Sequence, residues 1–146
     1  MSISIGELAR QSQVKIPTIR YYEQIGLLAS APRTEGNQRR YGKAETDRLN
    51  FIRHARELGF EIEDIRELLA MTAEPQASCH QADSIARNHL AEIDRRIESL
   101  QALRGELQRM VSECGHGRVC DCRIIEALAD HGHCTTDHGA SRQPVF

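Results

Sequence analysis

The chain contains no tryptophan and only three phenylalanines and three tyrosines among its 146 residues. Any core must therefore be mainly aliphatic, because few large aromatic side chains can contribute to it. No apolar run approaches the roughly 20 residues that a helix needs to cross a membrane, and the first residues do not resemble a secretory signal. We therefore expect a cytoplasmic protein with no membrane partner, built as one domain or as a small domain with an appendage.

The net charge of −2 conceals two segments of opposite sign. Residues 1–58 contain ten Lys and Arg against six Asp and Glu, whereas residues 59–146 contain nine against fifteen. The basic front segment predicts an anionic partner for that part of the molecule. Five cysteines in a cytoplasmic chain are expected to be reduced thiols, for which metal binding or redox sensing is more common than disulfide formation.

Two short helices are predicted at the front, over about residues 3–11 and 17–24. Ser4 can cap the first helix, Pro17 suits the first turn of the second, and Gly26 can end it. Two short helices joined by a tight turn form a helix-turn-helix unit, whose second helix enters the major groove of DNA. The second helix carries cations and hydroxyls that suit phosphates and base edges, on Lys15, Thr18, Arg20, Tyr21 and Tyr22.

Residues 32–41, with the sequence PRTEGNQRRY, predict a small hairpin. The turn signal Gly36-Asn37 lies between two flanks that can pair with each other. Three arginines on a hairpin beside a helix-turn-helix predict a wing that grips the DNA backbone, and they are Arg33, Arg39 and Arg40. The alternative is a solvated run of charge.

A long helical pattern begins at about residue 81. Apolar residues recur at alternating steps of three and four, with Arg104 as the one polar interruption. The repeating positions are Ala86, Leu90, Ile93, Ile97, Leu100, Leu107 and Val111. This pattern indicates about four heptads of coiled-coil seam but does not fix the direction of pairing. The alternative is that the helix packs on its own front domain, which is too small to cover so long a stripe.

The same stepping places Cys79 and Cys114 at the two ends of the seam, 35 residues apart. A continuous helix of that length separates them by roughly 50 Å, at about 1.5 Å rise per residue. The two thiols can share a ligand only if two such helices pair antiparallel, so that Cys79 of one chain meets the partner's Cys114. In that register Leu100 faces the partner's Ile93. The sequence therefore predicts a homodimer with a metal site built across it.

The segment after the seam, CGHGRVCDCRIIEAL, adds further soft ligands. Two glycines favour a flexible loop, and residues 123–129 predict a short amphipathic helix that closes it. Thiolates and imidazole select Zn, Cd, Pb and Hg as divalent ions, or Cu as a monovalent one. The candidate ligands are Cys79, Cys114, Cys122, Cys120 and His116. The polar tail that follows could bind metal weakly through His131, His133, Cys134 and His138.

Three runs, IGELARQSQVKIPTIRYYEQIGLL, R..GNQRRY and FIRHARELGFEIEDIRELL, resemble the DNA-binding region of the MerR family of transcription regulators. The resemblance is dense over residues 3–72 and extends to about residue 129. It implies a mainly α-helical protein: a winged helix-turn-helix with a further helix pair, a long antiparallel dimerisation helix and a metal-binding loop. The helix pair would span about 44–57 and 61–71. The implied DNA contacts are Arg20, Tyr21, Arg33, Arg39 and Tyr41. Family wings usually carry an aromatic where this chain has Gln38.

The resemblance also bears on the metal. The loop cysteines that bind metal in the family match Cys114 and Cys122, and copper(I) members carry serine where this chain has Cys79. A third thiolate supplies the charge and the coordination point that a divalent ion needs. The resemblance thus implies Zn(II) or Cd(II), with Pb(II) or Hg(II) as further candidates and copper(I) as the alternative. His116 and Cys120 resemble the additional ligands of zinc-sensing relatives, although Gly115 replaces a second adjacent cysteine.

The expected organisation is a winged helix-turn-helix over residues 1–72, a linker and dimerisation helix over 73–112, a metal loop and short helix over 113–130, and a flexible tail over 131–146. The implied function is metal-dependent activation of resistance or efflux genes, in which a homodimer binds promoter DNA and metal lets RNA polymerase engage. An iron–sulfur redox sensor is the alternative, but only Cys120 and Cys122 match its spacing. An enzyme is not expected, since no HExxH or comparable constellation occurs.

Overall fold

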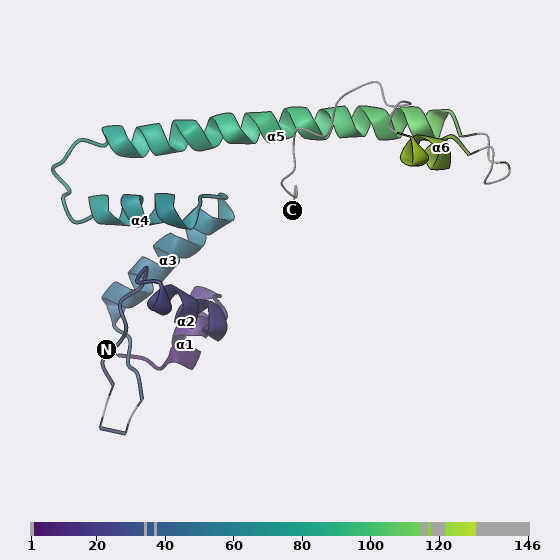
Figure 1. Cartoon of the computed structure of the whole chain (residues 1–146). Coiled ribbons are helices and arrows are strands. Elements are labelled where there is room, and N and C mark those ends of the chain that lie inside the picture. The colour runs from purple at the N-terminus through teal and green to yellow at the C-terminus, as the bar shows by residue number, and fades with distance from the viewer. Residues whose placement is uncertain (1, 34, 37, 115–116, 118–121, 131–146) are drawn as a thin grey trace. The chain divides into compact units, whose positions relative to one another are not determined.

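The computed structural model of the chain describes residues 2–33, 35–36, 38–114, 117 and 122–130. The chain divides into two compact units, residues 1–82 and residues 83–146. The described residues form helices and isolated β-bridges, without a regular strand (Figure 1). The mainly α-helical class expected from the sequence is therefore confirmed. The helices are α1 Ile5–Ser12, α2 Ile16–Gln24, α3 Lys43–Glu57, α4 Ile62–Met71, α5 His80–Ser112 and α6 Arg123–Ala129.

The first two helices form the predicted helix-turn-helix. Ser4 caps α1, where its hydroxyl accepts a hydrogen bond from the Glu7 backbone N–H at 3.3 Å. Gln13 ends α1 in the left-handed conformation, with φ of 57°. Pro17 lies in the first turn of α2, and Gly26 follows that helix with φ of 76°, a conformation that glycine adopts without a Cβ penalty. The expected helix bounds are correct to within two residues.

A short antiparallel pairing after α2 confirms the predicted hairpin. Arg33 and Arg39 form an antiparallel bridge, and the backbone N–H of Arg40 donates to the Pro32 carbonyl at 3.2 Å. At the base, Ile3 and Tyr41 exchange two backbone hydrogen bonds of 2.8 and 2.9 Å. These paired segments constitute the wing, and they tie it to the chain immediately before α1.

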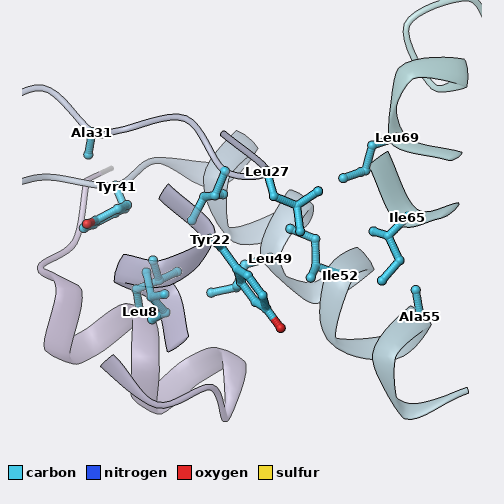
Figure 2. Close-up of a cluster of buried hydrophobic side chains, with 12 residues drawn as sticks. Leu8, Tyr22, Leu27, Ala31, Tyr41, Leu49, Ile52, Ala55, Ile65 and Leu69 are labelled. Carbon is cyan, nitrogen blue, oxygen red and sulfur yellow. The ribbon is translucent and has the colours of Figure 1, made fainter. Parts of the chain in front are cut away.

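The core of the first unit lies between α1, α2, α3 and α4, as Figure 2 shows. Its members are Leu8, Ile19, Tyr22, Leu27, Leu28, Ala31, Tyr41, Leu49, Ile52, Ala55, Ile65 and Leu69. Each fully buried Leu or Ile contributes about 1.5–3 kcal/mol relative to exposure. The expectation that Tyr22 faces DNA was wrong, because its side chain is only 7% exposed. Tyr22 lies three residues after Ile19, so both point inward from the same face of α2.

Two arginines hold the backbone just after α2. Arg48 of α3 donates from Nε to the Leu27 carbonyl at 2.7 Å, and Arg66 of α4 donates from Nη2 to the Ile25 carbonyl at 3.0 Å. Carbonyls at a helix C-terminus lack intrahelical partners and carry partial negative charge, so cationic donors stabilise them. The end of α2 is therefore fixed by both of the helices that follow it in the first unit.

The long helix predicted from the apolar repeat is confirmed as α5, a single helix of 33 residues that corresponds to about 50 Å. Its pairing as a coiled-coil seam stays a prediction. The helix begins directly after Cys79 and ends two residues before Cys114. Much of its apolar repeat is exposed, at Leu90 (58%), Ile97 (46%), Leu100 (42%), Leu107 (57%) and Val111 (64%). In the described part of the chain, no helix has both the length and the apolar character needed to cross a membrane.

Candidate nucleic-acid interface and metal centre

The outer face of α2 and the residue before it present polar groups to solvent. Lys15 and Arg20 are exposed, Tyr21 is 51% exposed, and Thr18 is half-buried. Tyr21 is exposed and its sequence neighbour Tyr22 is buried, since successive residues on a helix point about 100° apart. The exposed side chains carry hydrogen-bond donors, and DNA phosphates and base edges can accept hydrogen bonds from them.

An open cleft separates α2 from the wing. Arg20 lines it from α2, whereas Arg33 and Arg39 line it from the two paired segments of the wing. The remaining lining residues are Ser4, Ile5, Glu23, Gln24, Ser30 and Gln38. Guanidinium groups present several N–H donors in a planar fork that matches phosphate oxygens. The predicted contributions of these arginines to DNA binding remain predictions, and the structure brings all three to one cleft.

One acidic residue in this cleft was not singled out from the sequence. The Glu23 side chain is only 3% exposed, and both of its carboxylate oxygens accept hydrogen bonds. Oε2 accepts from Arg39 Nη1 at 2.8 Å, and Oε1 accepts from the Tyr41 hydroxyl at 2.8 Å. A buried carboxylate requires such partners, because its desolvation is otherwise costly. We call Glu23, Arg39 and Tyr41 the wing triad.

Tyr41 was expected to contact DNA, and the structure gives its side chain a different environment. The residue is 0% exposed and belongs to the core of the first unit. Burial raises the pKa of the Tyr41 phenol to about 12, and the hydrogen bond to the Glu23 carboxylate acts in the same direction. With this geometry, Tyr41 holds the wing against α2 and its phenol does not face solvent.

The candidate metal ligands described in the second unit are Cys114 and Cys122. Both side chains are half-buried, and their thiols are in hydrogen-bonding contact. Cys114 follows the end of α5, where its backbone N–H donates to the Val111 carbonyl at 3.3 Å. Cys122 occupies the N-cap position of α6. The two helix ends therefore bring together two thiols that lie eight residues apart in the sequence.

The position of Cys122 also favours its thiolate. The pKa of the Cys122 thiol is lowered chiefly by the nearby Ile125 backbone N–H, and further by Ile124 and by the Cys114 side chain. Free N–H groups at a helix N-terminus stabilise negative charge in this way. The thiolate is the form that binds metal, so the pair has the donor chemistry of a soft-metal site.

The other predicted ligands are more widely distributed. Cys79 is exposed and directly precedes α5, so a helix of 33 residues lies between it and Cys114. Cys120, His116 and the tail residues His131, His133, Cys134 and His138 lie outside the described residues. Within the part of one chain that the structure describes, no three His, Cys, Asp or Glu side chains gather as a metal site would require.

A second buried carboxylate lies near the end of α5. The Glu106 side chain is 3% exposed and pairs with Arg109 Nη2 at 3.0 Å, while Arg109 Nη1 is 3.4 Å from Glu113. Met110 on the same helix and Ala127 of α6 are also buried. Neither Glu106 nor Glu23 was predicted from the sequence to be a buried carboxylate. The only signal for either residue would have been an acidic side chain on an otherwise inward helical face.

Comparison with known proteins identifies the scaffold. Residues 3–72 match the model of the MerR helix-turn-helix family of regulatory proteins, and residues 46–110 match the MerR DNA-binding model. These two ranges cover α1 to α4 and most of α5. The matches therefore include the α2–wing cleft and the long helix.

Three similar proteins cover most of the chain. The HTH-type transcriptional regulator ZntR of Escherichia coli strain K12 is 43% identical over 128 residues, covering 85% of this chain and 90% of that protein. Heavy metal-dependent transcription regulator 2 of Rhizobium meliloti is 39% identical, covering 88% and 87%. The structure of PbrR691 from Ralstonia metallidurans CH34 in complex with lead(II) superimposes with a TM-score of 0.75 at 32% identity, covering 86% and 98%.

The expectation that the chain is not an enzyme agrees with these matches, which are to DNA-binding regulators. The helix-turn-helix, the wing and most of the long helix lie within the residue ranges that match the family models. The chain belongs to the MerR family of helix-turn-helix transcription regulators.

Proposed function

We propose that this chain is a metal-responsive regulator that binds promoter DNA as a homodimer and activates metal-resistance or efflux genes. The observation that supports the proposal is the position of two thiols at neighbouring helix ends: Cys114 follows α5, Cys122 is the N-cap residue of α6, and the Cys114 side chain helps to lower the pKa of Cys122. A relative named as heavy metal-dependent and a structural neighbour solved with lead(II) support a metal ion as the effector.

The proposed site takes a third thiolate from the other chain. Cys79 is exposed at the opposite end of α5, so antiparallel pairing of two α5 helices brings it to the partner's Cys114 and Cys122. Three thiolates completed by a fourth ligand suit Zn(II) or Cd(II), with Pb(II) or Hg(II) also compatible. Cys120 and His116 are proposed as additional ligands from the loop. Two thiolates alone would suit copper(I), so Cys79 sets the charge of the accepted ion.

The exposed stripe on α5 supports the dimer. The side chains of Leu100, Leu107 and Val111 line an apolar groove together with Leu103, Arg104, Gln108 and Ser112. Apolar side chains at heptad spacing gain about 25 cal/mol for each Å² removed from water. A second copy of the same helix supplies a matching stripe, in which Leu100 would pack against the partner's Ile93.

The shared ligand set provides a physical basis for regulation. Because the ligands come from both chains, the occupied site favours one relative orientation of the two α5 helices. An effector can shift a conformational equilibrium only by binding one state better than the other, and a site between chains meets this requirement. The two DNA-binding domains would then change orientation, and RNA polymerase would engage the promoter in that state.

The test requires an operator, which is obtained by selecting from a random-sequence pool the DNA duplex that the protein binds. This selected duplex is placed in a promoter, and transcription is measured against Zn(II), Cd(II), Pb(II), Hg(II) and Cu(I). The proposal expects activation by at least one divalent ion. In Cys79→Ser that activation should fall at least tenfold while affinity for the selected duplex is kept.

Cys134→Ser makes the same chemical change outside the proposed ligand trio. Because the tail is expected to bind metal only weakly, its activation should fall much less than that of Cys79→Ser. A normal divalent response in Cys79→Ser would refute the inter-chain site. Activation of the wild type by copper(I) alone would favour the alternative, a copper(I)-responsive regulator. A wild-type protein that responds to none of the five ions would refute metal control altogether.

A further inference from the structure

The wing triad contains an acidic residue, and the effect of its charge on DNA affinity can be either favourable or unfavourable. A carboxylate on a DNA-recognition helix repels phosphates, and protein–DNA affinity depends strongly on the phosphate backbone. Simple electrostatics therefore predicts that Glu23 weakens binding and that its removal should strengthen it. Glu23 nevertheless lies in the cleft between α2 and the wing, with its side chain 3% exposed. Its contacts offer a reason for the presence of an acid at this position.

The first contact concerns the orientation of an arginine. Arg39 is 35% exposed at its side chain, with Nη1 on the Glu23 carboxylate at 2.8 Å, and it lines the same cleft as Arg20 and Arg33. A guanidinium group has five N–H donors, so one carboxylate oxygen does not exhaust it. An arginine held along one edge has fewer orientations to lose when another edge binds phosphate.

The second contact concerns the wing as a whole. The Tyr41 hydroxyl donates to the other Glu23 oxygen at 2.8 Å, and the Tyr41 backbone is bonded to Ile3 at the base of the wing. The backbone of Arg39 forms an antiparallel bridge with the backbone of Arg33 across the wing. One carboxylate on α2 thus holds two residues of the same wing segment, 16 and 18 positions later in the sequence.

We propose that Glu23 is a positioning residue for DNA binding: its buried carboxylate orients Arg39 toward a phosphate and, through Tyr41, fixes the wing relative to α2. The repulsion between this acid and DNA is outweighed for the correct operator, because the wing and the recognition helix are held in one geometry. For DNA of unrelated sequence, where the fit is poor, the repulsion has no such compensation. Glu23 therefore contributes to the preference for the operator over other DNA.

The test is the substitution Glu23→Gln, which keeps the size of the side chain and removes its charge. Binding is measured by fluorescence anisotropy in metal-free buffer, on the selected duplex and on a random-sequence duplex of equal length. Affinity for the selected duplex should fall about tenfold or more, whereas affinity for the random duplex should stay the same or rise. The ratio of the two affinities is the quantity that reports the proposed role.

The matched control is Glu35→Gln, which removes the same charge from an exposed position of the wing. This variant should bind both duplexes equally well or more tightly. If Glu23→Gln behaves in the same way as Glu35→Gln, the positioning role is refuted. Thermal denaturation of each variant shows whether a loss of affinity reflects unfolding.

Two further measurements keep the proposal testable if Glu23→Gln is unstable. Tyr41→Phe removes one hydroxyl and retains the ring, and it should lower only the affinity for the selected duplex, by a smaller factor. Each phosphate contact contributes about −0.9 to the salt slope of binding to duplex DNA. Arg39→Met and Glu23→Gln should therefore each reduce that slope by about 0.9, and the double variant should reduce it no further. Independent, additive reductions would overturn the coupling between Glu23 and Arg39.

Discussion

Many leucines and isoleucines of the first unit are buried, whereas the apolar stripe along α5 is exposed. In residues 1–82, Leu8, Leu49 and Ile52 are fully buried, whereas Leu100 and Leu107 of α5 are 42% and 57% exposed. The exposed apolar residues follow a heptad spacing and therefore share one face of α5, whereas randomly scattered apolar residues would not. The first unit therefore makes its own core, whereas the stripe on α5 stays exposed in the single chain, as the dimer proposed above requires.

Leu49→Ala in α3 tests the buried core of the first unit and should destabilise it. The Leu49 side chain is 0% exposed within the core of the first unit, so truncation leaves a cavity. The free energy of unfolding should fall by about 2–5 kcal/mol, measured by urea denaturation. Leu58→Ala is the control, since Leu58 follows α3 and is 67% exposed. Equal losses in the two variants would show that burial in this unit does not determine stability.

Leu100→Ala tests the exposed apolar stripe of α5 and should weaken the proposed dimer. Removal of the Leu100 side chain from a paired seam costs about 1.5–3 kcal/mol per chain, which corresponds to an association weaker by a factor of about 10 to 150 for each copy. Sedimentation equilibrium should show weaker dimerisation, while circular dichroism retains the helical signal. Leu58→Ala again serves as the control, because it removes an exposed leucine outside the stripe. A dimer unchanged by Leu100→Ala would place the interface elsewhere.

A pH titration sharpens the comparison within the first unit. The pKa of Tyr41 is raised from 10 to about 12 in the folded chain, so folding favours its neutral phenol. The resulting stabilisation is fully present below pH 10 and is lost as the pH rises through about 12. Its size is roughly 2 kcal/mol or less. Urea denaturation should show this loss between pH 10 and 12 in the wild type relative to Tyr41→Phe. Parallel curves would assign the alkaline loss to other groups.

The sequence predicted the helices well because each carries its own local signals. Ser4, Pro17 and Gly26 mark helix ends through backbone chemistry that acts within a few residues. The heptad stripe of α5 is also a local pattern. These features need no knowledge of which distant segments meet, and so they can be read from one sequence.

The partners in the candidate sites were harder to predict. Glu23 is held by residues 16 and 18 positions away, and no local pattern links them. Tyr21 and Tyr22 have similar chemistry but opposite exposure, which depends on how α2 packs. The proximity of Cys114 to Cys122 was expected from resemblance and depends on where α5 ends and α6 begins. Tertiary packing decides each of these cases.

The arginine bonds after α2 have a mechanical consequence. Arg66 joins α4 to the Ile25 carbonyl, and Arg48 joins α3 to the Leu27 carbonyl, so a tilt of α2 relative to α3 and α4 would strain or break both hydrogen bonds. The two hydrogen bonds therefore couple the C-terminal end of α2 to both α3 and α4. Between α4 and α5 the chain exposes every residue from 72 to 79. Torque from the long helix can reach α4 through this short, solvated segment and through the hydrogen bond that Gln81 Nε2 of α5 donates to the Glu67 carboxylate of α4 at 3.0 Å.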